Sequence, residues 1–355
     1  MKYLAAFFVP LLYATPTFAD YADDALTAIR TLQEKFYNFD TGLWDDLWWQ
    51  SGNIVETLAR LGLQDPSFKD VAVNIISNTY AKSANQFGYT AWKNAYYDDE
   101  GWWAMAWIAS YDLTGDIKYL NTAKDLFEDM TGGWNTPCGG GIWWSKDREE
   151  IAAISNELFL NVGAHLANRV SGPQKEEYVN WSQMEWDWFA NSGIINVDGL
   201  VNDGIDPATC KNDGKTTFTY NQGVVLAGLS ELSRAGTGAE SSTAYISAAN
   251  NIASSVLSHL LDPSGILTEP VASPSLDETS AQFKGAFVRG LSTLNEWVPQ
   301  DRYKLFLERN ADAAWGQPKV DGGVIVDRWQ GGSGRGDASS HASGIDILVA
   351  AAIAG

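Results

Sequence analysis

Histidine and cysteine are scarce in this 355-residue chain, and their scarcity excludes several kinds of site. The three histidines and two cysteines form no cluster with zinc-site spacing, and no Cys-x-x-Cys redox motif occurs. No EF-hand spacing is present, and the run Gly139-Gly140-Gly141 lacks the Lys-Ser/Thr pair of a phosphate-binding loop. We therefore expect neither a metal nor a cofactor.

Basic residues are also in short supply. Lys and Arg number 24 against 44 Asp and Glu, which leaves a net charge of -20. A surface of this sign repels nucleic acids and anionic membranes, so we expect neither as a partner. We interpret the charge instead as that of a protein kept soluble in an acidic extracellular setting.

The N-terminal segment has the features of a secretory signal. Lys2 precedes an apolar run at 4–12, and Thr17-Phe18-Ala19 offers a small-residue cleavage site. The run is too short to span a bilayer stably, so we expect no stable membrane insertion. We predict that residues 1–19 are removed and that the secreted protein begins near Asp20.

Export to an oxidising compartment would affect the two cysteines. Cys138 and Cys210 are expected to pair there as one disulfide between two long loops. A loop of that size would stabilise the fold by about 4 kcal/mol in the chain-entropy model. Asn180, in Asn180-Trp181-Ser182, is a candidate glycosylation site.

Helical periodicity dominates the remaining sequence. Apolar residues recur at helical intervals, for example across 151–162, whereas alternating strand patterns are short, with 218–220 and 324–326 as the best candidates. We predict twelve helices, at 22–36, 51–62, 67–84, 100–113, 116–130, 149–170, 173–191, 221–235, 240–260, 278–294, 299–315 and 341–354.

The connections between these helices alternate between short and long. In an up-and-down array, alternate connections lie at the same end, so all the long loops gather on one face. Six helical hairpins with one elaborated face describe an all-α (α/α)6 barrel, with its cleft among the long loops. A solenoid would alternate in the same way, but no repeating sequence signature supports one. Because no Pro/Ser-rich linker divides 20–355, we predict a single domain.

The segment from Tyr96 to Trp103 places two adjacent carboxylates, Asp98 and Asp99, between tyrosines and tryptophans. Acid/base cleavage of a glycosidic bond needs paired carboxyls, and sugar rings stack on aromatic side chains. The alternative is that one aspartate merely caps a helix. A cap needs one carboxylate and no surrounding aromatics, so we favour catalysis.

The long loops hold most of the other tryptophan, glycine and aspartate clusters. Six such loops favour a carbohydrate cleft, although tryptophans can also wedge helix ends and glycines can serve only positive φ. The clusters lie at 43–50, 96–103, 138–144, 201–206, 218–223 and 327–330.

The Tyr96–Trp103 segment resembles the Asp-Asp signature of glycoside hydrolase family 76, the endo-α-1,6-mannanases. Further stretches resemble the fungal branch of that family in the same order along the chain. They are 48–53 (WWQSGN), 138–144 (CGGGIWW), 154–158 (ISNEL), 218–223 (FTYNQG) and 283–289 (FKGAFVR). The resemblance implies an (α/α)6 barrel that cleaves α-1,6-linked mannose backbones with retention of configuration.

By this resemblance, Asp98 matches the nucleophile and Asp99 the general acid/base. An ionised Asp98 raises the pKa of its neighbour by like-charge repulsion, which keeps Asp99 protonated for the leaving oxygen. Retaining enzymes hold the two carboxyls about 5 Å apart, which adjacent residues can reach if the backbone turns between them. We expect such a turn at a junction between loop and helix.

The remaining site predictions concern substrate binding. Polar side chains are expected to hydrogen-bond mannose hydroxyls, and tryptophans to stack on the rings, although bridging, capping and core packing are open alternatives. The predicted substrate-binding residues are Trp49, Asn53, Tyr97, Trp102, Trp144, Asn156, Asp203, Tyr220, Asn221 and Gln222. Lys284, Arg289 and His165 are expected to be structural.

The sequence therefore predicts a secreted, cofactor-free retaining endo-α-1,6-mannosidase acting on mannan. Three alternatives remain open: a transmannosidase of the same fold acting on cell-wall or lipid-anchor glycans, a non-catalytic mannan-binding protein, and an unrelated barrel glycosidase or lyase with its acid at Asp45 or Asp46. The apolar segment 345–354 loosely resembles a lipid-anchor signal. We expect it instead to be retained as the twelfth helix, which closes the barrel.

Overall fold

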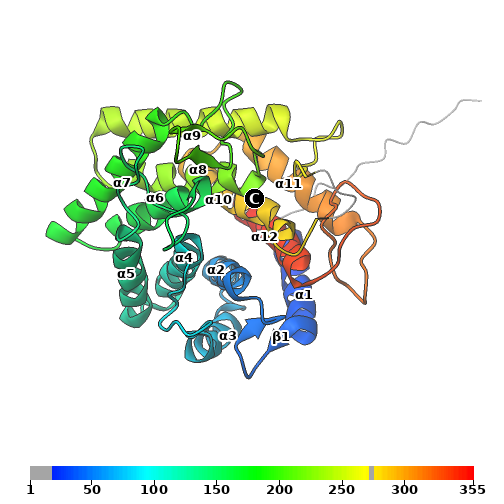
Figure 1. Ribbon diagram of the computed structural model, residues 1–355. Coiled ribbons are helices and arrows are strands. Elements are labelled where there is room, and N and C mark those ends of the chain that lie inside the picture. Colours follow the sequence, from blue (N-terminus) through cyan, green and yellow to red (C-terminus); the bar gives the residue numbers. More distant parts are fainter. Residues whose placement is uncertain (1–17, 272–275) are drawn as a thin grey trace, which may run out of the picture.

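Twelve α-helices dominate the computed structural model, which describes residues 18–271 and 276–355 (Figure 1). The predicted signal segment lies outside these residues, apart from positions 18 and 19. The helices are α1 (Phe18–Phe36), α2 (Trp48–Gln64), α3 (Lys69–Lys82), α4 (Tyr97–Thr114), α5 (Ile117–Thr131), α6 (Ala153–Ala167), α7 (Pro173–Asn191), α8 (Thr219–Arg234), α9 (Ala239–His259), α10 (Phe283–Trp297), α11 (Asp301–Gly316) and α12 (Ala338–Ala354).

All twelve predicted helices are confirmed, with differences mainly at their ends. The helix predicted at 149–170 begins only at Ala153, because the preceding two residues pair as a strand. The helix predicted at 278–294 begins at Phe283, after a 3-10 turn, η1 (Ser280–Gln282). α4 begins three residues earlier than predicted, which changes the position of the two aspartates.

The strand predictions were wrong. Residues 219 and 220 begin α8, and of 324–326 only Val324 takes part in pairing, as an isolated bridge to Val320. The strands that form are β1 (Tyr37–Asn38), β2 (Leu43–Trp44), β3 (Ile151–Ala152), β4 (Gly204–Asp206) and β5 (Lys211–Asn212). They make two small antiparallel sheets, β1-β2 and β3-β4-β5.

The even-numbered helices form an inner ring, and the odd-numbered helices lie outside it (Figure 1). Each inner helix contacts the next inner helix along the chain, and α12 contacts both α10 and α2, which closes the ring. Each outer helix packs on an inner one, for example α5 on α4 and α9 on α8. This arrangement is the predicted (α/α)6 barrel.

Burial explains the character of the inner helices. Every residue of α6 is buried, as are residues 338–352 of α12, because these helices have neighbours on all sides. The outer helix α9 instead buries a single stripe, formed by Tyr245, Ala249, Ile252, Ala253 and Val256. Within the described residues, no helix is long and apolar enough to cross a membrane.

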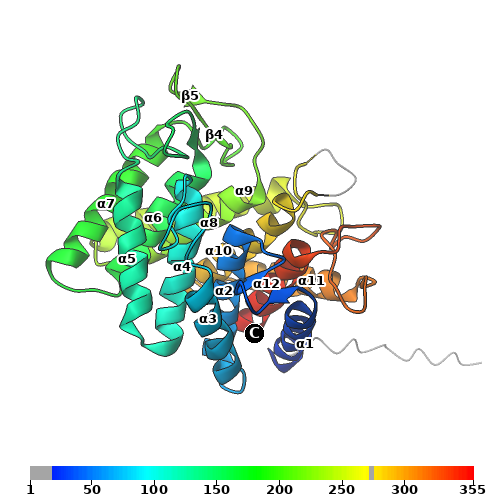
Figure 2. The ribbon, with the colours of Figure 1, turned by 60° about the horizontal axis from the view of Figure 1, so that its bottom comes forward.

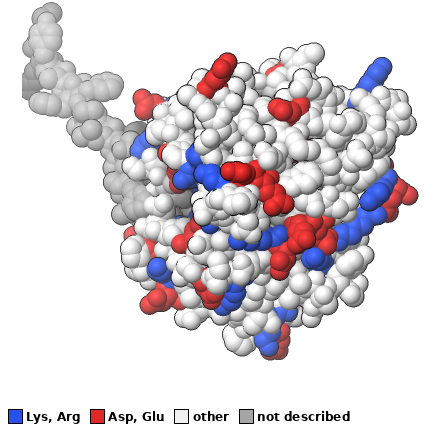
Figure 3. All heavy atoms as spheres, turned by 90° about the vertical axis from the view of Figure 1, so that its left-hand side faces the viewer, with Lys and Arg blue, Asp and Glu red and all other residues white. Residues whose placement is uncertain are grey.

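The connections alternate as predicted and place the long loops at one end of the barrel. The short ones, such as 115–116 and 298–300, lie at the opposite end. Figure 2 shows the β4–β5 hairpin projecting at the long-loop end. Basic and acidic side chains lie side by side across the face drawn in Figure 3, so on this face the net charge of -20 does not gather into one acidic patch.

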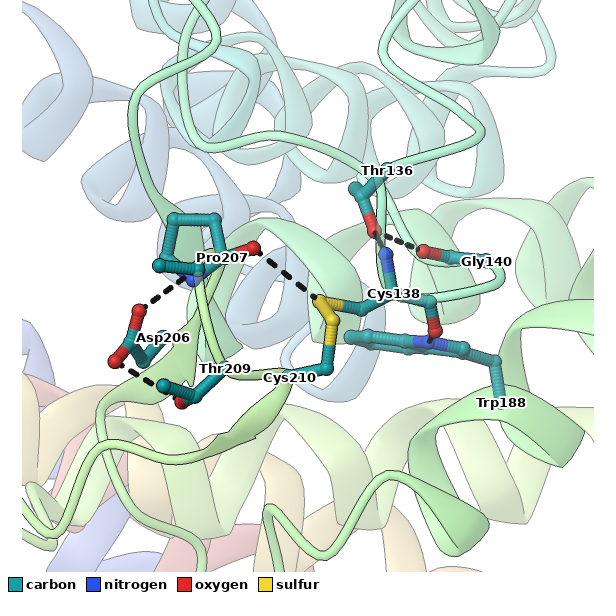
Figure 4. The surroundings of a disulfide bond; sticks show 9 residues. Thr136, Cys138, Gly140, Trp188, Asp206, Pro207, Thr209 and Cys210 are labelled. Atoms are coloured by element: carbon teal, nitrogen blue, oxygen red, sulfur yellow. Dashed lines mark hydrogen bonds between the residues drawn. A yellow bond between two sulfur atoms is a disulfide. The ribbon is translucent and has the colours of Figure 1, made fainter.

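The predicted disulfide is present between Cys138 and Cys210, with a Cα–Cα distance of 5.2 Å (Figure 4). It ties the connection before α6 to the connection before α8. The Trp188 indole of α7 donates a hydrogen bond of 3.1 Å to the Cys138 carbonyl. A Cβ atom at Gly140 would lie 2.8 Å from the Trp188 ring, and φ there is +153°, so this turn requires glycine.

A buried ion network closes the ring. Arg289 of α10 lies 2.7 Å from the Asp346 carboxylate of α12 and 3.3 Å from Glu56 of α2. Its guanidinium also donates to the Asn53 side chain, and Thr57 of α2 donates to Asp346. Asn53 is therefore held inside the wall by Arg289, and its predicted contact with substrate stays a prediction.

We predict that Asp346→Ala destabilises the fold by about 3–5 kcal/mol, because it leaves the Arg289 guanidinium buried without its closest charged partner. Urea unfolding monitored by tryptophan fluorescence measures this loss. Glu308→Ala removes a carboxylate paired with Lys304 near the surface and should cost less than about 1 kcal/mol. Equal losses for the two variants would contradict the importance assigned to the network.

Candidate active site

The two adjacent aspartates lie inside the first turn of α4. The helix begins at Tyr97, whose amide donates to the Trp144 carbonyl at 2.9 Å, and Asp98, Asp99 and Glu100 follow it. The pair therefore lies at the predicted junction between loop and helix, on its helical side rather than in the loop residues before it. Successive side chains there diverge by about 100°, so the two carboxyls have different surroundings. The positive end of the helix dipole favours negative charge at this turn.

One oxygen of Asp98 is held and the other is not. Its Oδ2 accepts a hydrogen bond of 3.0 Å from the Trp144 indole, which comes from the long loop before α6. Its Oδ1 is buried and has no hydrogen-bond partner among the described residues. The carboxylate is thus fixed in orientation while one oxygen remains available to react.

Asp99 is oriented by Asn94. The Asn94 side-chain amide donates to Asp99 Oδ2 at 2.5 Å, and its Oδ1 accepts from the Tyr96 amide at 2.7 Å. The Asn94 backbone amide also donates to Glu100 Oε1 at 3.1 Å. A single asparagine therefore fixes the turn that leads into the helix.

The surroundings of the two aspartates shift both of their pKa values upward. Burial raises the pKa of Asp98 to about 6, partly offset by the Trp144 indole. Burial, followed by the charge of Asp98, raises the pKa of Asp99 well above its usual value. The carboxyl with the stronger shift keeps its proton when its neighbour ionises.

Sequence reasoning missed an ion-pair cluster behind this turn. Glu100 is fully buried, and burial raises its pKa to about 8 although Lys146 lies 2.7 Å away. The Lys146 ammonium also pairs with Asp129 at 2.7 Å, and Lys93 pairs with Asp129 at 3.0 Å. Only the tertiary fold brings these residues of separate elements together, so the local sequence held no signal for the cluster.

Four of the predicted aromatic contacts divide into surface and core. Trp144 and Trp49 are half-buried, whereas Tyr97 and Trp102 are only 5% and 4% exposed. Trp49 stacks on Trp102 with ring centres 5.9 Å apart, and Tyr97 packs against Gly133. Tyr97 and Trp102 therefore pack in the core, and their predicted substrate contacts stay predictions.

Asn156 and Gln222 also have structural roles, and their predicted contacts with substrate stay predictions. The Asn156 amide accepts from the Ile142 N–H at 2.7 Å and donates to its carbonyl at 3.1 Å. Gln222 binds Val201 in the same manner, at 2.8 and 2.7 Å. Both side chains are fully buried, and each holds a long loop against the start of an inner helix.

Tyr220, Asp203 and Asn221 remain together at the start of α8 and the loop before it. The Tyr220 ring stacks on Phe283 at 3.9 Å, and burial and then the charges of Asp203 and Asp98 raise the pKa of Tyr220 well above its usual value. Burial raises the pKa of Asp203 to about 6, partly offset by the Asn221 amide. The charges of Asp203 and Asp98 therefore both act on the Tyr220 hydroxyl.

A groove of about 410 Å³ extends from Asp203 along the β3-β4-β5 sheet at the long-loop end. Its walls are strongly acidic, with Glu150, Asp206 and Asp213 among its lining residues and Lys215 as a basic member. The groove adds solvent-accessible space along the loop that carries Asp203, and neither Asp98 nor Asp99 is among its lining residues.

Two further buried acids, Glu157 and Glu185, were not identified from the sequence, although Glu157 lies in the motif at 154–158. Glu157 and Glu185 are fully buried, and none of their carboxyl oxygens has a hydrogen-bond partner in the described part of the chain. Burial raises both pKa values well above the usual range, which favours the neutral form of each carboxyl. The signal that could have identified Glu157 was the presence of an acidic residue within the apolar pattern of 151–162.

The other predicted features of the chain lie away from this turn. In the described ranges, no three His, Cys, Asp or Glu side chains group as a metal site would require. His165 is buried in the barrel, and burial lowers its pKa to about 4. Asn180 is exposed on α7 while Ser182 of the same sequon is fully buried, and its glycosylation stays a prediction.

Fold and site together define an (α/α)6 barrel with a paired-carboxylate, aromatic-bordered site at its long-loop end. The model of glycosyl hydrolase family 76 matches residues 20–353, so the chain belongs to this family.

The chain is similar to curated fungal proteins over part of its length. It is 30% identical over 150 residues to the mannan endo-1,6-alpha-mannosidase DCW1 of Candida albicans, covering 38% of this chain and 32% of that protein. It is 28% identical over 156 residues to DFG5 of Saccharomyces cerevisiae, which bears the same enzyme name, covering 40% and 33%. Each match thus spans about a third of the relative.

Solved structures share the fold over nearly the whole chain. An inactive variant of an alpha-1,6-mannanase of a Salegentibacter species, with two consecutive aspartates replaced by alanine and alpha-1,6-mannotetrose bound, has a TM-score of 0.79 at 23% identity, covering 95% of this chain and 100% of that one. Dfg5 of Chaetomium thermophilum in complex with glucosamine has a TM-score of 0.76 at 18% identity, covering 97% and 92%. These similarities establish the (α/α)6 fold.

We predict that Asp98→Asn stabilises the folded protein at pH 7 but not at pH 4. The pKa of Asp98 rises from 3.8 to about 6 on folding, so in this window the folded state binds more protons than the unfolded state. The free energy of unfolding therefore falls as pH rises through the window, and the amide removes this loss. Urea unfolding should show a gain on the order of 1–2 kcal/mol at pH 7.

Asp40→Asn serves as the control, because Asp40 is exposed on the β1–β2 turn. It should leave the free energy of unfolding nearly unchanged at both pH values. A gain for Asp98→Asn that is the same at pH 4 and pH 7 would contradict the assigned proton linkage.

Proposed function

We propose that the protein is a retaining endo-α-1,6-mannosidase that hydrolyses the α-1,6-linked mannose backbone of mannan. The observation that carries this proposal is the pair Asp98 and Asp99, two carboxyls in unequal surroundings at the long-loop end of a family 76 barrel. The names of the fungal relatives, and the inactive mannanase variant that lacks two consecutive aspartates, support it.

In the first step, the ionised Asp98 attacks the anomeric carbon of mannose with its free oxygen. Asp99 donates its proton to the leaving glycosidic oxygen, so the bond breaks without releasing an alkoxide. A glycosyl ester on Asp98 results. The indole of Trp144 stabilises the negative charge on the other oxygen of Asp98 before attack and fixes the direction of the carboxylate.

In the second step, Asp98 is an ester and carries no negative charge. Like-charge repulsion from Asp98 therefore no longer disfavours the ionised form of Asp99. Asp99 removes a proton from water, and the resulting hydroxide attacks the anomeric carbon from the face opposite the ester. Asp98 leaves as a carboxylate and the pair returns to its starting state. Two displacements give retention of configuration.

The half-buried faces of Trp49 and Trp144 are placed to stack on sugar rings, while Asp203, Tyr220 and Asn221 supply polar groups for mannose hydroxyls. The groove beside Asp203 gives room for further sugars. The proposal includes secretion, supported by the signal features of 1–19 and by a disulfide suited to an oxidising compartment.

We predict that Asp98→Asn abolishes turnover of linear α-1,6-mannan, because no nucleophile remains. Asp99→Asn should also cripple hydrolysis, yet retain part of the activity on an aryl mannoside whose leaving group needs no proton. The release of new reducing ends measures the activity of both variants. Asp45→Asn is the control and should behave as wild type, which also tests the rival acid at this position.

Near-normal hydrolysis by Asp98→Asn would overturn the assignment. Product analysis with and without an added mannoside acceptor separates hydrolysis from transmannosylation, in which a sugar hydroxyl replaces water in the second step. Mannan binding without any bond cleavage by the wild type would identify a non-catalytic binding protein.

We predict a bell-shaped pH profile for kcat/KM on mannan. The acidic limb should fall below pH about 6, where Asp98 becomes protonated, and the alkaline limb should follow the raised pKa of Asp99. On the aryl mannoside, Asp99→Asn should keep the acidic limb and lose the alkaline one. A profile without an acidic limb would contradict the role of Asp98.

A further inference from the structure

A hairpin at the long-loop end exposes two aromatic side chains that the proposed mechanism does not use. Phe87 is 89% exposed and Tyr89 is 40% exposed, whereas most aromatic residues of this chain are buried or half-buried. They lie in the loop between α3 and α4, directly before the turn that carries Asp98 and Asp99. Exposing aromatic surface of this size to water is costly.

The backbone of this hairpin is tight and strained. Gln86 and Tyr89 exchange two hydrogen bonds, of 3.1 and 2.8 Å, across the two-residue turn Phe87-Gly88. Both turn residues have positive φ, +47° and +88°. Asn-Gly is the favoured sequence for such a turn, and a bulky ring at its first position costs roughly 1–3 kcal/mol. The chain thus holds Phe87 at the tip against its conformational preference.

The hairpin is fixed to the barrel behind its tip. Trp92 is buried, its indole donates to Ser83 Oγ at 3.0 Å, and its backbone amide donates to the Ala84 carbonyl at 2.9 Å. Its ring packs edge-on against Trp107 of the inner helix α4 at 4.9 Å. The two exposed rings therefore stand on a rigid base.

The exposed rings connect with the acidic turn through a short series of contacts. The Lys146 ammonium lies 5.6 Å from the centre of the Tyr89 ring and pairs with Glu100, the residue after Asp99. Tyr96, which is 39% exposed, packs on Trp144 at 4.8 Å, and Trp144 holds Asp98. The hairpin is thus joined to the turn through Lys146 and Glu100, and a second aromatic pair, Tyr96 and Trp144, lies against Asp98.

The chemistry of the hairpin selects a neutral polyhydroxylated partner. Residues 84–92 (ANQFGYTAW) contain no charged side chain, in a protein with a net charge of -20. Exposed rings flanked by the amides of Asn85 and Gln86 and the hydroxyl of Thr90 match a sugar, whose apolar face stacks and whose hydroxyls hydrogen-bond. Residues 84–92 themselves offer anionic lipids and nucleic acids no basic residue, and Lys146 beside Tyr89 is already paired with Glu100 and Asp129.

We propose that this hairpin is an outer binding platform, on which Phe87 and Tyr89 stack against distal sugars of a long neutral glycan whose reacting bond lies at Asp98. This inference rests on the proposed function and deepens it, because it makes the enzyme selective for polymers over short oligosaccharides. An oligosaccharide confined to the acidic turn does not reach the hairpin.

The test measures binding in the Asp98→Asn background, by calorimetry with linear α-1,6-mannan and with α-1,6-mannotriose. Adding Phe87→Asn removes the ring and installs the sequence that this turn prefers, so the variant should be at least as stable as its parent. Its affinity for mannan should fall about three- to tenfold, with mannotriose binding unchanged within about twofold. Tyr89→Ala should act in the same direction.

Trp297→Ala is the matched control, because Trp297 is 40% exposed at the short-loop end of α10. It should change neither affinity. Unchanged mannan affinity in Phe87→Asn, an equal loss for both ligands, or binding of the parent to phosphatidylcholine vesicles that Phe87→Asn abolishes would each overturn the platform. Failure of the wild type to bind or cleave mannan would instead overturn the proposed function, so the two failures are distinguishable.

Discussion

The contact between Arg289 and Asp346 is the constraint on which the barrel depends. A ring of six inner helices has to join its last member to its first, and here the join buries charge from α10, α12 and α2 in one network. Buried charges are stable only with their partners in place, so the network accepts one arrangement of the three helices. The closed ring brings the start of α4, with Asp98, and the start of α8, with Tyr220, to the same long-loop end.

Much of the fold could be predicted because its signals are local and repeated. Helical periodicity and the alternation of connection lengths led to twelve helices and an (α/α)6 barrel, and the structure has both. The central pair, Asp98 and Asp99, could be predicted because carboxyls and aromatic residues are concentrated in eight consecutive positions. Even there, the start of α4 was misplaced by three residues, because the helix has no side-chain cap to mark it.

The substrate-binding predictions fared differently, for a physical reason. An asparagine or glutamine near the start of a helix can face a ligand or bind a neighbouring backbone, and only the tertiary neighbours decide between these roles. Asn156 and Gln222 bind loop backbone through both the oxygen and the nitrogen of the side-chain amide. The Asn53 side chain accepts a hydrogen bond from Arg289. The pairing of Glu100 with Lys146 is equally invisible in the sequence, because 46 positions separate them.

The contact between α1 and α12 has a consequence for the topology of the chain. α1 runs toward the long-loop end and α12 runs back from it, so residue 18 and the last helical residue lie near each other at the short-loop end (Figure 2). The barrel therefore has no intrinsic first helix. A circular permutant that joins these two ends and opens the chain at a short connection such as 235–238 would keep every inner-ring contact and every long loop. Protein fusions at either end would likewise stand on the side opposite the carboxylates.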